Sequence, residues 1–217
     1  MDALLTPLKN LLKNARLKHF EQSQTLFYAG DTITENYILK SGIVKVFDID
    51  DKGDEKILQL VKAPALLPID SLLSSPNTIS WHYGALTDVE VYVFSPDELH
   101  HEITTTPALC SYMLNWIAVE SHELMVRISG MSKSDTRDKI LTILHFLNVY
   151  YTEPEKRGWK RIEFPITHQL MADIAGITRE STTIQMGHLQ NEKIIRSRRP
   201  YVEINVERLA KYTQPED

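Results

Sequence analysis

The chain has 217 residues, of which 42% are hydrophobic and 24% are charged, and its formal net charge is −5 at pH 7. This length suits two modest domains, and the composition is typical of a folded globular protein rather than a disordered one. Apolar runs are too short to cross a bilayer, and charges within residues 1–16 interrupt any secretory leader, so we expect a cytoplasmic protein without membrane contact. The single cysteine, Cys110, excludes an internal disulfide, a cysteine-based zinc site and a cysteine-ligated iron–sulfur cluster within one chain.

The charges are unevenly distributed along the chain. Residues 156–211 hold eleven Lys and Arg against six Asp and Glu, about +5, whereas residues 1–155 carry about −8. A locally basic C-terminal part on an acidic body suits a protein that meets phosphate groups at one end only.

The first half of the chain predicts a short helix followed by many strands. Leucines spaced at helical intervals over residues 4–18 indicate an amphipathic helix. Short runs rich in β-branched and aromatic residues then alternate with turn sequences such as Ser41-Gly42. These runs cover residues 25–28, 36–40, 43–49, 56–61 and 89–94. Closely spaced short strands predict an antiparallel barrel or roll.

Two helices should follow the strands. Ser95 and Pro96 have the residue types of an N-cap and a first helical position, and Pro107 begins a helical stretch that runs to about Met131. A heptad-like apolar stripe on the second helix favours pairing with a second chain. The predicted dimerisation residues are Leu109, Met113, Trp116, Ile117, Leu124 and Ile128. Glu120 interrupts the stripe, which leaves open that this helix only covers its own domain.

A helix-turn-helix is predicted after a further helix over residues 136–151, preceded by a polar break at residues 132–135, and a strand over residues 159–165. Thr167 should cap the first helix of the motif, Gly176 suits a left-handed turn residue, and Thr178 should cap the second helix. Leu170, Met171 and Ile174 should point inward, as should residues 184–189. Such a motif sets the N-terminal end of its second helix into the major groove of DNA.

The start of the second helix carries groups that suit DNA. Arg179 can donate twice to a guanine edge and Glu180 can accept from cytosine N4, while hydroxyl groups and helix N-terminal amides can hold phosphate oxygens. Residues 194–204 alternate around a basic turn, as a two-stranded wing along the DNA backbone would. The predicted DNA-binding residues are Thr167, His168, Thr178, Arg179, Glu180, Ser181, Thr183, Arg196, Arg198 and Arg199.

These motifs resemble the cyclic-AMP receptor protein and fumarate-nitrate regulator (Crp/Fnr) family of bacterial transcription regulators over nearly the whole chain. The resemblance rests on Thr-Arg-Glu-Ser at residues 178–181, on Thr167, and on the glycine-punctuated runs at residues 27–31 and 37–46. It implies an α+β fold with an N-terminal antiparallel β-roll of the cyclic-nucleotide-binding type (residues 1–106), a long dimerisation helix (107–133) and a C-terminal winged helix-turn-helix (134–217).

The resemblance also implies a way of working. A homodimer would bind double-stranded DNA at an approximately palindromic site and recruit or obstruct RNA polymerase, with an unknown small molecule as a possible effector. By the same resemblance, Arg179 and Glu180 read bases, while Thr178 and Ser181 touch phosphate.

Two departures from the family pattern bear on specificity. Cyclic-nucleotide sensors of the family carry a Gly-Glu pair and, about ten residues later, an arginine that neutralises the cyclic phosphate, whereas residues 63–73 and 79–83 contain no arginine. A buried phosphate without a cation is strongly disfavoured, so we predict no cyclic-AMP binding. Ile184 stands where many relatives place a second base-reading arginine, so the preferred DNA sequence cannot be borrowed from them.

Three alternatives remain at this stage. His82, His100 or His101 could offer an axial nitrogen to haem, although packing or surface roles are the ordinary interpretation. A cupin-like enzyme on the roll would need clustered histidines, but residues 25–94 contain no His-x-His and the chain has no nucleotide-binding or esterase motif. We therefore expect no enzyme activity, metal or cofactor. Finally, the winged helix could serve protein contact alone.

Overall fold

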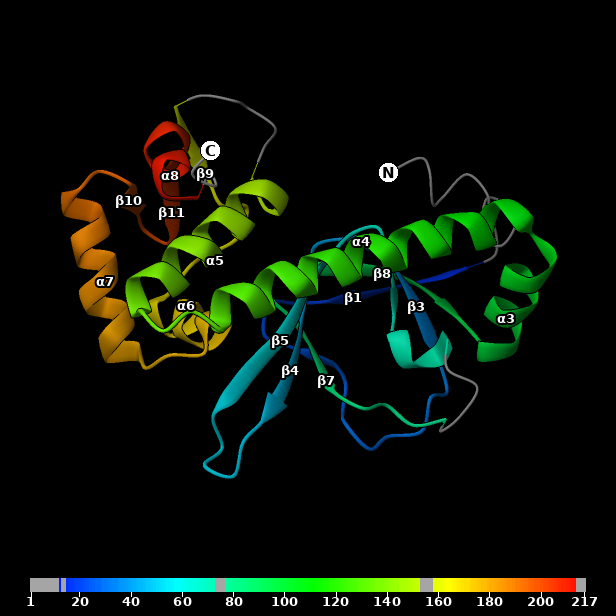
Figure 1. Cartoon of the computed structure of the whole chain (residues 1–217). Coiled ribbons are helices and arrows are strands. Elements are labelled where there is room, and N and C mark those ends of the chain that lie inside the picture. The colour runs from blue at the N-terminus through cyan, green and yellow to red at the C-terminus, as the bar shows by residue number, and fades with distance from the viewer. Residues whose placement is uncertain (1–11, 13–14, 73–76, 153–157, 214–217) are drawn as a thin grey trace. The chain divides into compact units, whose positions relative to one another are not determined.

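The structure is a computed structural model that describes residues 12, 15–72, 77–152 and 158–213 (Figure 1). The chain divides into two compact units, residues 1–120 and 121–217, and the division falls within one long helix, α4 (Pro107–Met131). Among the described residues, no helix is long and apolar enough to span a membrane.

The N-terminal unit is built on two four-stranded antiparallel sheets, with strand orders β1-β8-β3-β6 and β2-β7-β4-β5. The strands are β1 (Arg16–Phe20), β2 (Thr25–Phe27), β3 (Asn36–Ser41), β4 (Ile43–Ile49), β5 (Glu55–Lys62), β6 (Ala65–Leu67), β7 (His82–Ala85) and β8 (Val89–Phe94). Residues of both sheets share one apolar core, including Leu39, Val46, Tyr83 and Val91. The predicted β-roll is confirmed.

The start of the chain differs from the sequence-based prediction. The helix expected over residues 4–18 falls largely outside the described residues, and its last part is wrong because Arg16 begins β1. The backbone from Arg16 to Phe20 pairs antiparallel with β8, and this pairing overrides the local helical spacing. Strands β6 and β7 were not predicted, because the first has three residues and the second contains Gly84, which weakens a strand pattern.

The junction between β3 and β4 requires glycine. Gly42 has φ +93, a conformation that side chains rarely adopt, and a Cβ atom placed there would lie 2.3 Å from the carbonyl oxygen of Asp88. The close approach brings the β3–β4 turn against the turn that precedes β8, and it lets the hydroxyl of Thr87 accept from the backbone N–H of Ile43 at 2.9 Å.

Helices follow the roll as predicted. A short 3₁₀ helix (Ile69–Leu72) precedes β7, and α3 (Pro96–Thr105) follows β8. Ser95 caps α3 in a reciprocal arrangement with Glu98, in which each side chain accepts from the other residue's backbone N–H. Helix α4 then begins at Pro107 and ends at Met131, at the residues that the sequence indicated.

The C-terminal unit combines helices with a three-stranded antiparallel sheet of order β10-β11-β9. Its elements are α5 (Thr136–Tyr150), β9 (Trp159–Arg161), α6 (His168–Ala175), α7 (Arg179–Asn191), β10 (Ile195–Arg198), β11 (Tyr201–Asn205) and α8 (Val206–Thr213). Asp135 caps α5. The core contains Ile140, Leu144, Phe164, Ile174, Leu189 and Ile204. The terminal helix α8 was not predicted.

Candidate nucleic-acid interface

Helices α6 and α7 form the predicted helix-turn-helix, and their ends are fixed by three residues. The Thr167 hydroxyl accepts from the backbone N–H of Leu170 at 3.0 Å, and the Thr178 hydroxyl accepts from that of Ser181 at 3.2 Å. Gly176 ends α6 in the left-handed conformation, with φ 64 and ψ 40. Each predicted cap and the predicted turn residue therefore lie where the local chemistry of the sequence indicated.

The inner face of α7 is set by Thr182, Met186 and Leu189, which are all buried. The prediction that the inner side begins at Ile184 was wrong, because that side chain is 57% exposed. Ile184 is two residues from both Thr182 and Met186, and a helix turns by about 100° per residue, so it points away from the core. The apolar residue types alone did not indicate which side of α7 faces the core.

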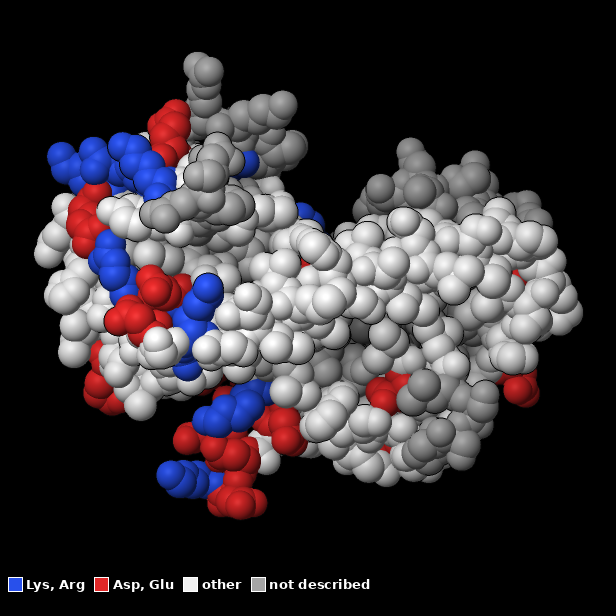
Figure 2. Space-filling view, in the orientation of Figure 1, with Lys and Arg blue, Asp and Glu red and all other residues white. Residues whose placement is uncertain are grey.

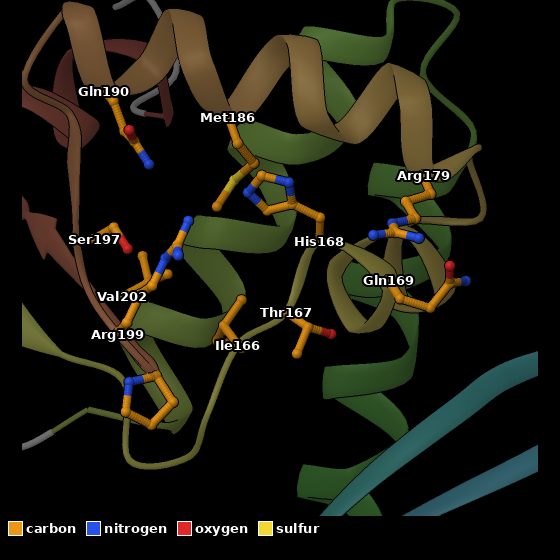
Figure 3. Close-up of a pocket in the computed structure, with 11 residues that line it drawn as sticks. Ile166, Thr167, His168, Gln169, Arg179, Met186, Gln190, Ser197, Arg199 and Val202 are labelled. Atoms are coloured by element: carbon orange, nitrogen blue, oxygen red, sulfur yellow. The ribbon is translucent and has the colours of Figure 1, made fainter.

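A groove of about 790 Å³ lies between the two helices and the strands of the hairpin (Figure 3). Its polar lining includes His168 and Gln169 from α6, Arg179 from the start of α7, and Arg199 from the β10–β11 turn. Figure 3 shows Arg179 and Gln169 on one side of this groove, Arg199 on the other, and the His168 ring between them. The structure thus brings together residues that are up to 31 positions apart in the sequence.

Hydrogen bonds connect α6 to α7 at the groove. The Thr183 hydroxyl donates to the backbone carbonyl of Arg179 at 2.9 Å, and its oxygen lies 3.0 Å from His168 Nδ1. With the hydroxyl hydrogen used in this way, the His168 ring donates to the Thr183 oxygen. Two predicted DNA-binding side chains are therefore also braces between the two helices.

Two arginines outside the groove hold helices α6 and α7 in place. Arg127, buried on α4, donates to the Ile174 carbonyl near the end of α6 at 3.2 Å. Arg137, on α5, donates twice to the carboxylate of Glu192 at the end of α7, at 2.8 and 2.6 Å. These hydrogen bonds hold the pKa of Glu192 below its ordinary value. The sequence analysis missed both arginines because their partners are distant in sequence.

The hairpin of β10 and β11 has the geometry of the predicted wing. Arg196 pairs across the strands with Glu203, to which its Nε donates, and its guanidinium lies 4.4 Å from the Trp159 ring centre. Arg198 and Arg199 are exposed. Figure 2 shows Lys and Arg side chains gathered on the C-terminal unit, over the part that Figure 1 labels β10 and the adjacent end of α7.

Comparisons with known proteins agree with this architecture. Residues 17–105 match the cyclic nucleotide-binding domain family, and residues 139–212 match the Crp-like helix-turn-helix domain family. The chain is a member of the Crp/Fnr family of DNA-binding transcription regulators.

Individual relatives are distant in sequence. The global nitrogen regulator of Synechococcus elongatus is 23% identical over 83% of this chain and 81% of the relative. The regulatory protein HlyX of Actinobacillus pleuropneumoniae is 25% identical over 93% of this chain and 82% of the relative. A cyclic nucleotide-binding domain containing protein from Listeria monocytogenes shares the fold, with a TM-score of 0.77, 19% identity and coverage of 95% and 98% of the two chains.

In this Crp/Fnr chain the long helix α4 has two apolar faces. Leu109, Met113 and Trp116 are buried in the core of the roll, so their predicted role in dimerisation is corrected: these side chains are not available to a second chain. Ile117 also packs against that core, and Leu124 is half-buried. Of the predicted set only Ile128 is largely exposed, at 61%.

The exposed face of α4 follows a different heptad phase. Leu114 is 66% exposed and Met125 is 61% exposed, and together with Ala118, Ser121 and Ile128 they repeat at spacings of four, three, four and three residues. Such a spacing keeps side chains on one side of a helix. The sequence alone could not separate the two faces, because both carry apolar residues.

In this Crp/Fnr chain, the stretch that the sequence analysis compared with the phosphate site of cyclic-nucleotide sensors contains a buried acid. The buried Asp70 carboxylate accepts from the Tyr83 hydroxyl at 3.1 Å and from the Ser80 backbone N–H at 3.3 Å. Burial and the neighbouring carboxylate raise the pKa of Tyr83 well above its ordinary value. Ile79 is also buried. This stretch of the roll thus contains a buried acid, the tyrosine hydroxyl that donates to it and a buried apolar side chain.

The histidines considered for haem lie on two different elements, His82 in β7 and His100 and His101 in α3. The His82 ring stacks on Phe47, with ring centres 5.2 Å apart, and its Nδ1 accepts from the Ala29 backbone N–H at 3.3 Å. His100 and His101 are exposed on α3. Within the described ranges, no group of three or more His, Cys, Asp or Glu side chains is arranged to hold a metal ion.

Proposed function

We propose that this regulator acts in the cytoplasm as a homodimer that binds approximately palindromic double-stranded DNA, with one α7 in the major groove of each half-site. The observation that carries the proposal is the exposure of Arg179 and Glu180 in the first turn of α7, at a groove whose opposite side holds Arg199. This end of a reading helix is the part that contacts base edges in helix-turn-helix proteins.

Base reading is assigned to two adjacent side chains. Arg179 has the two donors that match guanine O6 and N7, and Glu180 can accept from cytosine N4. Thr167, Thr178 and Ser181 lie at the N-terminal ends of α6 and α7, where hydroxyl and backbone N–H groups can hold phosphate oxygens. His168 and Thr183 contribute by bracing the two helices and by lining the same surface.

The wing contributes charge rather than sequence information. Arg198 and Arg199 are exposed at the hairpin turn and would contact the DNA backbone. Arg196 is already engaged by Glu203 and Trp159, so we assign it to supporting the hairpin beside the DNA. The alternative, a winged helix that serves only protein contact, has no comparable observation in its favour.

Dimerisation is assigned to the exposed α4 stripe of Leu114, Ala118, Ser121, Met125 and Ile128. The small residues at the centre allow two helices to approach closely, and the larger apolar residues flank them. By family resemblance, the bound dimer recruits or obstructs RNA polymerase, and the roll responds to a small-molecule effector.

Replacement of the base-reading arginine tests the DNA-binding surface. A duplex is first selected from a random pool with the full-length protein, and its affinity is then compared with that of a scrambled duplex. Arg179→Ala should lower the affinity for the selected duplex by about 1–3 kcal/mol while leaving the scrambled duplex nearly unchanged. Lys211→Ala, which removes an exposed positive charge of α8 outside the groove lining, is the control. An unchanged preference in Arg179→Ala would favour the protein-contact alternative.

A charge in the α4 stripe tests the dimer. Met125→Glu would place two carboxylates against each other in the seam, so its dimer should be at least about tenfold weaker in sedimentation equilibrium. Affinity for the selected duplex should fall with it. Val119→Glu changes a 43% exposed residue on the other side of the same helix and should remain dimeric. A wild-type chain that sediments as a monomer on and off DNA would exclude the homodimer.

A further inference from the structure

Ile184 is an exposed apolar residue on the outward face of the reading helix. Its side chain is 57% exposed, whereas the inner face of α7 is formed by Thr182, Met186 and Leu189. The helix geometry places Ile184 about 40° around the axis from Glu180 and about 60° from Gly187. A single exposed isoleucine is ordinary on a protein surface, so its position on this particular face is what requires a reason.

No large apolar side chain lies beside Ile184 on the outward face of α7, so its side chain projects from the helix. The next position on the outward face is Gly187, where an added Cβ would meet no atom within 4 Å. Glu180, one turn earlier, is exposed and polar. The branched side chain therefore stands between a carboxylate on one side and bare backbone on the other, and a groove wall can approach it closely.

We infer that Ile184 reads the C5-methyl group of a thymine beside the base pair that Glu180 contacts. The inference rests on the proposed function, because it requires α7 to lie in the major groove. Among the groups that bases expose there, the thymine methyl is the apolar one, and the others are hydrogen-bond donors and acceptors. An isoleucine cannot satisfy those polar groups and would separate them from water, which disfavours guanine, adenine or cytosine at that position.

The chemical consequence is a requirement for a methyl group rather than for a hydrogen-bond pattern. Uracil presents the same donors and acceptors as thymine and lacks only the methyl. Replacing thymine by deoxyuridine therefore removes the contact with Ile184 and leaves contacts by Arg179 and Glu180 in place. Loss of one buried methyl corresponds to about a fourfold loss of affinity, and loss in both half-sites to more than about tenfold.

The experiment uses the full-length protein and a duplex selected from a random pool. Each thymine is replaced in turn by deoxyuridine, symmetrically in both half-sites, and affinities are measured at fixed salt. We expect one thymine position at which the wild type loses about tenfold. Ile184→Ala should bind the thymine and uracil duplexes equally, while Ile184→Val should keep most of the difference. Val149→Ala, which shortens a 53% exposed residue of α5, should behave as the wild type.

The outcomes separate this inference from the proposed function. A pool from which no sequence is enriched overturns the proposed function, and the inference with it. A selected sequence that tolerates deoxyuridine everywhere overturns the inference alone. Retention of the thymine preference by Ile184→Ala also overturns it, because another group must then contact the methyl. All variants change exposed side chains and should therefore melt at the temperature of the wild type. Equal melting temperatures would show that the substitutions leave folding unaffected.

Discussion

The two units of the molecule differ in how much of the family's chemistry they retain. In the C-terminal unit, Arg179, Glu180 and the caps at Thr167 and Thr178 occupy the ends of two short helices and remain exposed or available. In the roll, the stretch that binds phosphate in cyclic-nucleotide sensors holds buried Asp70 and Ile79. Each unit therefore keeps the fold of its own domain family, but the stretch of the roll compared with the phosphate site contains no arginine. A matching domain family is thus a guide to the fold of the roll and a poor guide to its ligand.

The largest expected effect is a loss of stability in the roll on replacement of Gly42. In Gly42→Ala the new Cβ would meet the Asp88 carbonyl at 2.3 Å, and the residue would keep φ near +93. The Cβ is fixed directly to the backbone and the carbonyl is part of it, so neither can rotate away. We expect a loss of about 3 kcal/mol or more in the free energy of unfolding of the roll. Urea unfolding followed by tryptophan fluorescence measures it.

The matched control for this change lies in the other unit. Gly187→Ala adds a Cβ that meets nothing within 4 Å, in the interior of α7. It should stabilise the C-terminal unit by about 0.5–1 kcal/mol, because alanine favours a helix over glycine. Equal unfolding curves for the wild type and Gly42→Ala would show that the β3–β4 turn can shift, and would contradict the predicted strain.

The contrast between the units also explains what could be predicted from sequence. The ends of helices α6 and α7 are set by residues within the motif itself. Thr167 and Thr178 cap their N-terminal ends and Gly176 ends α6, so the helix-turn-helix was predicted at the correct residues. The wing was predicted for the same reason. By contrast, β1 depends on pairing with a strand some seventy residues later, and no local pattern over residues 16–20 reveals that partner.

Helix α4 shows the limit of periodicity. Its bounds were predicted by Pro107 and by the polar break after Met131, yet its dimerisation residues were assigned to the face that packs on the roll. Both faces carry apolar residues at helical spacing, so only the packing of Leu109, Met113 and Trp116 in the roll distinguishes them. Likewise, Arg127 and Arg137 hold α6 and α7 through hydrogen bonds to residues that lie 47 and 55 positions away in the sequence. No local sequence pattern indicates such partners.

A smaller effect concerns a buried acid on α4, Glu120, to which Gln59 of β5 donates a hydrogen bond. Glu120 is 8% exposed, and burial raises its pKa, although hydrogen bonds from Gln59 and Trp116 act in the opposite direction. A carboxyl whose pKa is higher in the folded state contributes full stability below its unfolded pKa, and that contribution is lost as pH rises through the folded pKa. Glu120→Gln cannot ionise, so the variant should be more stable than the wild type at pH 8.

The pH dependence distinguishes ionisation from packing. The difference in unfolding free energy between Glu120→Gln and the wild type should shrink as pH falls toward the ordinary pKa of a glutamate. Glu21→Gln, which changes an exposed carboxylate of the same unit, should show little difference over the same range. A difference for Glu120→Gln that stays constant from pH 8 to pH 5 would assign the effect to packing instead.

The smallest expected effect is none, and it tests the comparison between the units directly. A ligand present at a hundred times its dissociation constant stabilises its protein by about 2.7 kcal/mol, so millimolar cyclic AMP would reveal even weak micromolar binding as a rise in melting temperature. We expect no rise with cyclic AMP or cyclic GMP, and no heat of binding in calorimetry. The cyclic phosphate would have to be buried in a stretch that holds the Asp70 carboxylate and contains no arginine, so no arginine of that stretch could compensate its charge. Micromolar affinity for either nucleotide would mean that a cation from outside this stretch reaches the phosphate, and the two units would then differ less than their sequences indicate.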